Sequence, residues 1–340
     1  MIDAGNRIVS AAPALAIGTE APTARHGGVE RLPVQMFATV MGIGGIGNAW
    51  RAASRILGVP SFIGSGLLDV AAALFAVLTF AYAIKLLRHF QAVAAEFRHP
   101  VKANFFGAIS VSAMIISIGF RDTLPDVALA TWIGGAGLHI VLAVTFIRRW
   151  VLEQQDEVEM TPAWFIPVAG NFLVPVGGVP LGFIDISWFF FSVALIFWLV
   201  LFTIAMHRVV FCAPMSERSV PTLFILLAPP SIGLSAYFAF THGDAGFLAH
   251  ILYCFGLFIA ILIATLANRF WRVHFFLSWW AMTFPSSAWA TATVVYYRAH
   301  PTVVTQAVAW ASLAAASAIV IAVFARTMRA LVLGQLFNET

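Results

Sequence analysis

The sequence predicts an all-α membrane protein in which ten helices cross the bilayer. Its 340 residues are 61% hydrophobic and 10% charged, with a mean hydropathy of +0.91. A soluble domain of this length could not cover so much apolar surface with polar side chains. The apolar residues form ten stretches, each close to the roughly 20 residues that cross a bilayer as a helix. Proline lies in the interior of alternate stretches only.

The ten expected spans follow one another through short loops, the longest of which is 148–161. We expect the spans near residues 33–50, 62–86, 101–120, 125–147, 162–181, 184–207, 220–241, 246–267, 273–296 and 302–325. The first span is short, and the fifth and sixth are closely spaced. Together they predict one membrane domain over 31–330, between a flexible tail at 1–30 and a short tail at 331–340.

Proline separates the spans into two sets. The even-numbered spans have no interior proline, whereas the odd-numbered spans contain Pro167, Pro175, Pro229, Pro230 and Pro285. Proline removes a helical hydrogen bond and bends the helix axis. Within a membrane, a broken helix is tolerated only where protein or a watery cavity satisfies the freed backbone groups. We therefore expect bent odd helices around a path and straight even helices facing lipid, as in a pore or transporter.

The positions of the basic residues predict the orientation. Fifteen of the nineteen Lys and Arg residues fall on the side that holds both termini, and the other four are Arg51, Arg55, Arg121 and Arg298. Loops on the cytoplasmic side of membrane proteins are enriched in Lys and Arg. Both termini are therefore expected in the cytoplasm, with the protein in the inner (plasma) membrane.

Other classes of site find little support in the sequence. Residues 42–47 match GxGxxG, but their glycines lie inside an apolar span rather than between a strand and a helix. No histidines form an HxxxH or HExxH pair, and Cys212 and Cys254 fit no ligand or disulfide spacing. The basic residues are scattered rather than gathered on one face that could bind nucleic acid. We expect no cofactor, no metal, no nucleic-acid partner and no enzymatic activity.

The polar residues of the odd spans favour an anion path. These spans contain no Asp or Glu, and Lys102, Arg98 and Arg272 lie near their cytoplasmic ends. Cation paths usually use carboxylates or carbonyls, whereas anion paths use basic residues and neutral donors. The candidate pore-lining polar residues are Gln35, Asn104, Asn171, Ser231 and Ser287. The alternative is that such residues only join neighbouring helices.

The ninth span contains the most specific local feature. Phe284 stands directly before Pro285, and a bend there would point the ring differently from its neighbours. An aromatic ring in a narrow tube can block it by bulk and by dewetting. We expect Phe284 to be the pore constriction, oriented by Pro285, and Phe106 to be a candidate second ring against it.

Four stretches of the chain, at 32–50, 97–106, 162–172 and 279–286, resemble the tellurite-resistance/dicarboxylate transporter family. The His-Pro-Val-Lys motif at 99–102 and the Trp-Trp-Ala-Met-Thr-Phe-Pro motif at 279–285 carry the resemblance most specifically. This family includes bacterial tellurite-resistance proteins, plant slow anion channels, yeast malate permeases and fungal sulfite exporters. The resemblance implies five helical hairpins around a quasi-fivefold axis, with the odd helices lining a central pore. It also implies a homotrimer with one pore in each protomer, and it places Phe284 at the pore-occluding phenylalanine.

Two functions remain open at this stage. The first is a gated channel for small anions such as chloride or nitrate. The alternative is a secondary carrier of C4-dicarboxylate, sulfite or tellurite-type oxyanions. A carrier usually needs a proton-accepting group, and His139 and Asp185 are the internal groups that the sequence offers.

Overall fold

The computed structural model describes residues 28–334, apart from the side chain of Trp271. All regular secondary structure among these residues is helical. Residues 1–27 and 335–340 lie outside the described part, and with them most of the two predicted tails. Gln35 and Leu333, near the two ends of the described part, line the same cavity, and the face on which this cavity opens is called the terminal face below.

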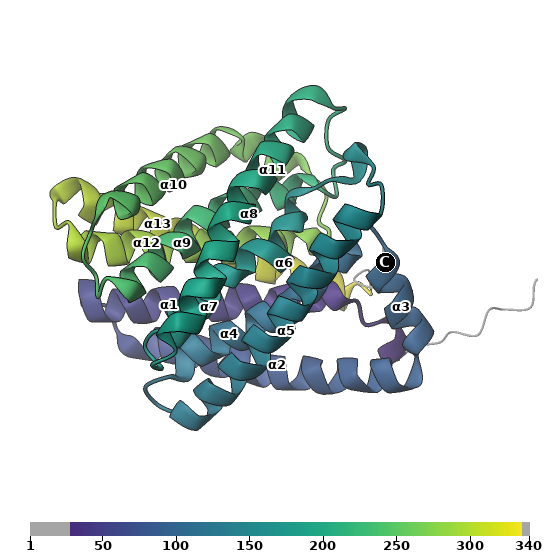
Figure 1. The fold of residues 1–340 in the computed structure, drawn as a ribbon, viewed down its shortest axis with the longest axis horizontal. Helices are drawn as coiled ribbons and strands as arrows, with labels where there is room; N and C mark the ends of the chain where they lie inside the picture. The colour runs from purple at the N-terminus through teal and green to yellow at the C-terminus, as the bar shows by residue number, and fades with distance from the viewer. Residues whose placement is uncertain (1–27, 335–340) are drawn as a thin grey trace, which may run out of the picture.

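Five long helices form one set, and they correspond to the even-numbered spans. They are α2 (Ser61–Arg88), α5 (Pro125–Leu152), α8 (Ile184–Phe211), α10 (Phe247–Thr265) and α13 (Val303–Val332). In Figure 1, α2 runs along one edge of the molecule, α10 along the opposite edge, and α5 and α8 run diagonally in front of the other helices. We call these the outer helices.

The odd-numbered spans form a second set, the inner segments, and each of them begins with a 3-10 helix that continues into an α-helix. The inner segments are η2 (Val34–Met36) with α1 (Phe37–Leu57); η3 (Lys102–Phe106) with α4 (Gly107–Phe120); η5 (Pro162–Phe165), α6 (Ile166–Ala169), η6 (Gly170–Phe172) and α7 (Leu173–Gly178); η7 (Val220–Leu227) with α9 (Ala228–Phe240); and η8 (Leu277–Met282) with α12 (Thr283–Ala299). The remaining elements are η1 (Val29–Arg31), α3 (Phe90–Arg98), η4 (Glu157–Glu159) and α11 (Ala267–Arg272).

Seven of the described helical stretches are long and apolar enough to cross a membrane: the five outer helices, Lys102–Phe120 and Val220–Phe240. The first, fifth and ninth expected spans are helical but do not meet this measure as single helices. Helix α1 carries Arg51 and Arg55 near its end, the fifth segment is divided into short helices, and the ninth, 277–299, is rich in Ser and Thr.

Burial separates the inner segments from the outer helices. The apolar window is 83% buried in Lys102–Phe120 and 72% buried in Val220–Phe240. In the outer helices the buried share lies between 22% and 39%. Because a membrane helix needs no polar face where it meets lipid, this division matches a buried inner set surrounded by helices with one exposed apolar side.

Contacts between the inner segments close into a cycle. Helix α1 contacts α4, α4 contacts α7, α7 contacts α9, α9 contacts α12, and α12 contacts α1. Each inner segment also packs on the outer helix that follows it, from α1 with α2 to α12 with α13. The glycines of α1 allow this close approach, because a Cβ at Gly44 would lie 2.7 Å from Ile115 and one at Gly47 would lie 2.9 Å from Leu68.

The prolines act differently from the expected kinks within continuous helices. All five named prolines occupy the second or third residue of an α-helical stretch, in α6, α7, α9 or α12. In the first turn of an α-helix the N–H has no intrahelical acceptor, so the missing proline donor costs little there. The break in each inner segment is therefore the change from 3-10 to α-helix. In the fifth, seventh and ninth spans proline lies in the first turn of the new helix, whereas α1 and α4 begin without a proline.

Candidate functional site

A small cavity lies where the five inner segments change from 3-10 to α-helix. It has a volume of about 40 Å³, and every inner segment contributes to its lining. The lining residues are Ala38, Met41, Phe105, Val111, Phe165, Ile166, Ala169, Gly170, Ile225, Ala228, Pro229, Ile232, Trp280, Ala281, Phe284 and Pro285. None of these side chains is charged or carries a hydroxyl or amide group. We call this the central cavity, and it has room for only a few water molecules.

Phe284 and Pro285 both lie in the wall of the central cavity, as the sequence suggested for the constriction. Phe284 is the second residue of α12 and is 8% exposed. Its ring packs against α1 at Gly45, where a Cβ would lie 3.0 Å from the ring. A glycine at this position therefore leaves the space that the ring occupies.

Phe105, rather than Phe106, provides the second aromatic ring of the central cavity. Phe106 points away from it, and its ring packs edge-on against Tyr82 and Phe97 at centroid distances of 6.1 and 5.0 Å. The difference is one residue within η3, where three residues rather than 3.6 complete a turn. The expectation for Phe106 therefore moves to its neighbour.

A larger cavity of about 840 Å³ opens on the terminal face and is called the vestibule. Phe105 lines both the vestibule and the central cavity, so the two spaces meet at this ring. The vestibule is lined by five basic residues, two histidines and several neutral donors, and no Asp or Glu is among its described lining residues. The basic residues are Lys102, Arg218, Arg272, Arg326 and Arg329, and the histidines are His99 and His274. The carboxylate of Glu217 lies 3.7 Å from the vestibule residue His274.

Lys102 and Arg272, the candidate pore-mouth residues, line the vestibule, and Gln35 does so as well. Arg98 does not, and its backbone carbonyl instead accepts a hydrogen bond from Arg149. Sequence reasoning missed the contribution of three further arginines, which come from a loop and from the last turns of α13. They are Arg218, Arg326 and Arg329. Their separation from Lys102 along the chain hides the cluster until the helices are assembled.

His99 accepts two backbone hydrogen bonds at the edge of the vestibule. Its Nδ1 accepts hydrogen bonds from the backbone N–H groups of Val101 and Lys102, at 3.1 and 3.2 Å. Burial and the nearby Lys102 charge lower the pKa of His99 below its ordinary value of 6.5, against the opposite effect of Glu159. Protonation at Nδ1 would remove the acceptor that orders this turn.

The other predicted polar residues of the inner segments do not line the central cavity. Instead, their side chains donate to backbone carbonyls near the breaks between helical stretches: Asn104 to Pro100 (2.9 Å), Asn171 to Val168 (2.7 Å), Ser231 to Leu227 (2.6 Å) and Ser287 to Thr283 (2.7 Å). Such bonds to the backbone give these polar side chains partners in an apolar interior. The polar residues are thus satisfied within their own segments, and the cavity wall is left apolar.

The two proposed proton-accepting groups have different surroundings. Asp185 is exposed in the first turn of α8. His139, in contrast, is fully buried, and its Nδ1 lies 2.8 Å from the hydroxyl of Ser110. Among the described residues its Nε2 has no hydrogen-bond partner. Gly170, which lines the central cavity, separates the ring from that space, since a Cβ there would lie 2.5 Å from the imidazole.

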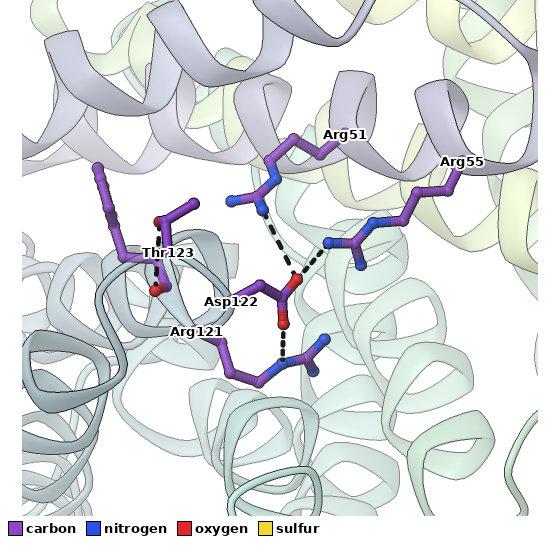
Figure 2. Close-up of polar contacts among 6 residues, drawn as sticks. Arg51, Arg55, Arg121, Asp122 and Thr123 are labelled. Carbon is purple, nitrogen blue, oxygen red and sulfur yellow. Dashed lines mark hydrogen bonds and ion pairs between the residues drawn. The ribbon is translucent and has the colours of Figure 1, made fainter.

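Three arginines meet one carboxylate at the ends of α1 and α4 far from the vestibule (Figure 2). Arg55 and Arg121 donate hydrogen bonds to Asp122, the latter at 3.0 Å, and Arg51 lies 3.6 Å from the same carboxylate. Burial raises the pKa of Asp122, but the hydrogen bonds and charges of Arg121 and Arg55 outweigh it and hold the pKa below its ordinary value. The three arginines therefore exceed the charge of the one carboxylate that they surround.

Comparisons with known proteins place the chain in a family. The family model described as voltage-dependent anion channel (SLAC1) matches residues 31–328. The chain is 27% identical to the S-type anion channel SLAH3 of Arabidopsis thaliana over 90% of its own length and 50% of that protein. It is 24% identical to the Arabidopsis guard cell S-type anion channel SLAC1, over 88% of the chain and 55% of that protein.

A bacterial relative is covered more fully. The chain is 24% identical to the tellurite resistance protein TehA homolog of Haemophilus influenzae, over 79% of the chain and 82% of that protein. By contrast, the chain spans about half the length of SLAH3. The match over residues 31–328 confirms the family resemblance that the sequence motifs suggested, and the chain belongs to the SLAC1 voltage-dependent anion channel family.

Proposed function

We propose that the protein is a gated channel for small anions such as chloride or nitrate, and that Phe284 occludes its pore. The observation that carries this proposal is the apolar central cavity at the break of all five inner segments, with Phe284 in its wall. A path that crosses such a cavity is closed to ions while it remains narrow and dry. Phe105 is a second barrier in this proposal, between the vestibule and the cavity.

Charge at both ends of the inner set supports anions as the permeating species. The vestibule has five basic residues in its lining, and the opposite end places three arginines around one aspartate. Clefts lined by one sign of charge concentrate counter-ions and raise their rate of arrival. Because the central cavity offers no polar side chain, an ion must lose hydration there, which favours small monovalent anions over multivalent oxyanions.

The proposed pore has a defined arrangement. Ten helical spans form five hairpins around a quasi-fivefold axis, with the inner segments lining the pore and the outer helices facing lipid. Exposed apolar residues along the outer helices, such as Phe80, Val141 and Phe258, support the lipid-facing assignment. We place the protein in the inner (plasma) membrane as a homotrimer, with the terminal face in the cytoplasm because most Lys and Arg residues lie on that side. The proposal assigns no enzymatic activity to the chain.

The direct test is anion current through Phe284→Ala in planar bilayers or oocytes, compared with the native protein at equal amounts in the membrane. A Phe→Ala change in a core adds space on the order of 100 Å³, which would convert the small cavity into one that holds several more waters. We expect a rise in chloride and nitrate current. The matched control is Phe191→Ala, since Phe191 is a buried ring (3% exposed) on α8 outside the cavity. Equal currents in the native protein and Phe284→Ala would reject the gate.

A proton-coupled anion carrier is the second candidate, and His139 favours it. A buried ionisable group with an unpaired nitrogen inside a membrane helix is a candidate for proton transfer. In this case a proton gradient alone would drive anion uptake into vesicles, and His139→Gln would abolish that coupling. Uptake that ignores the proton gradient in both proteins would leave the channel as the function.

A further inference from the structure

We propose that Glu157, His207 and Cys212 form a binding site for a divalent cation of the Zn²⁺ class. The three residues come from two parts of the chain, η4 and the end of α8. Their spacing in the sequence matches no common metal motif, which is why sequence analysis predicted no metal. The fold alone brings a carboxylate, an imidazole and a thiol together.

The distances suit a single ion. One ligand atom from each residue lies within 4.8 Å of the other two, and the Cys212 Sγ is 3.8 Å from the Glu157 Oε2. Zinc bonds of about 2.0–2.3 Å in a tetrahedral site separate neighbouring ligand atoms by about 3.3–3.8 Å. Rotation of the side chains can bring the ligand atoms to these shorter separations, since Glu157 and His207 are exposed and Cys212 is partly exposed.

A buried arginine holds the two backbone segments of the site in place. The Nε and Nη2 of Arg208 donate to the carbonyl of Val158 at 3.3 and 3.2 Å, and its Nη1 donates to the carbonyl of Ala213 at 2.6 Å. These two carbonyls belong to the residues that directly follow Glu157 and Cys212, and Arg208 itself follows His207. Each ligand residue is therefore a sequence neighbour of Val158, Arg208 or Ala213, which these hydrogen bonds hold together. Binding an ion thus requires little ordering of the backbone.

The ligand set identifies the class of metal. Mg²⁺ and Ca²⁺ prefer oxygen ligands throughout, whereas mixed sulfur, nitrogen and oxygen ligands suit Zn²⁺. The Glu157 carboxylate and the Cys212 thiolate would together neutralise a divalent ion, with one proton released from the thiol. Water would occupy the fourth position, because the cluster faces solvent.

The site has a structural consequence that does not depend on what crosses the pore. Helix η4 directly precedes the fifth inner segment, and α8 is the outer helix that follows this segment. An ion held by Glu157, His207 and Cys212 would tie these two ends to each other on one face of the hairpin. Metal binding should therefore raise the thermal stability of the protein.

The test is a Co²⁺ titration of the purified full-length protein, prepared without a polyhistidine tag. Cobalt serves as a probe because a bound thiolate produces a charge-transfer absorption band. The background is Cys254→Ser, which removes the other free cysteine. We expect this variant to show the band at one cobalt per chain, and Zn²⁺ to displace it and raise the melting temperature.

The ligand variants decide the assignment. Cys212→Ser should lose the charge-transfer band, and His207→Gln and Glu157→Gln should each weaken cobalt binding at least about tenfold, since even outer-shell changes weaken metal sites by that much. Size-exclusion chromatography checks that each variant is folded. No band in Cys254→Ser, or a band of equal strength in folded Cys212→Ser, would overturn the proposal and leave the three residues as an ordinary surface cluster.

Discussion

Removal of one vestibule charge, by Arg272→Gln, should lower anion current in a manner that depends on salt concentration. Arg272 lines the vestibule and comes from α11, outside the wall of the central cavity. The change keeps a polar side chain of similar reach and removes one positive charge. Its effect on the current should therefore be electrostatic, through the local concentration of anions.

The size of the vestibule sets the magnitude of the effect that one charge has on the local anion concentration. A cavity of about 840 Å³ has the volume of a sphere about 6 Å in radius, and at that distance two unit charges in water interact by about 0.7 kcal/mol. This energy corresponds to roughly a threefold change in local anion concentration. The Debye length is about 30 Å at 0.01 M and about 3 Å at 1 M. The factor by which Arg272→Gln lowers the local anion concentration should therefore remain between about two and three in dilute salt and fall to about 1.2 in molar salt.

The assay is single-channel or macroscopic chloride current in planar bilayers over this range of salt. The matched control is Arg98→Gln, because Arg98 is also basic and exposed but does not line the vestibule. We expect Arg98→Gln to leave the current unchanged at every salt concentration. A reduction by Arg272→Gln that persists in molar salt would refute the electrostatic reasoning and point to a change in packing.

Three further predictions address stability and the position of the second ring. Glu96→Gln should lower the free energy of unfolding by about 3–5 kcal/mol, because it leaves the buried Lys85 ammonium, now 3.0 Å from Glu96, without its counter-charge; a melting temperature equal to that of the native protein would contradict this. The pKa of His99 is lowered in the folded state, so the stability that it contributes is present above its ordinary pKa of 6.5 and is lost as the pH falls through 6.5 toward the lowered value. Melting temperatures from pH 7.5 to 5 should therefore fall less steeply in His99→Gln, and identical slopes would reject the assignment. Phe105→Ala should raise anion current and Phe106→Ala should not, because only the Phe105 ring lines both the vestibule and the central cavity. The reverse order of currents would reject Phe105 as the second ring.

Hydropathy located the outer helices, and proline identified three of the five inner segments. The length of an apolar stretch can be counted in the sequence, so the positions of α2, α5, α8, α10 and α13 could be predicted directly. Proline marked the interruptions in the fifth, seventh and ninth spans, where it lies in the first turn of a new α-helix, but the same change of helix type before α1 and α4 has no proline to mark it. The Phe284-Pro285 pair was also recognisable, since a ring beside such an interruption is an unusual local pattern.

The residues that surround the cavities could be predicted only in part. The choice between Phe105 and Phe106 depends on the helical phase of a 3-10 stretch, and the sequence does not reveal where 3-10 becomes α-helix. Asn171 and Ser231 were candidate pore-lining donors because they are polar residues in inner segments. In the structure their side chains donate instead to backbone carbonyls of their own segments. Lys102, Arg326 and Arg329 are far apart in the sequence and line one vestibule only because of tertiary packing.

The central claim is that anions diffuse through this protein along their own gradient. It is tested most directly by reversal potentials of the purified protein in planar bilayers, with chloride, nitrate and sulfate exchanged on one side and with a pH gradient applied separately. We predict reversal potentials that follow the chloride or nitrate gradient, small permeability for sulfate, and no shift with the pH gradient or with exchange of the cation. A reversal potential that moves with pH at fixed anion concentrations would contradict the channel and favour proton-coupled transport.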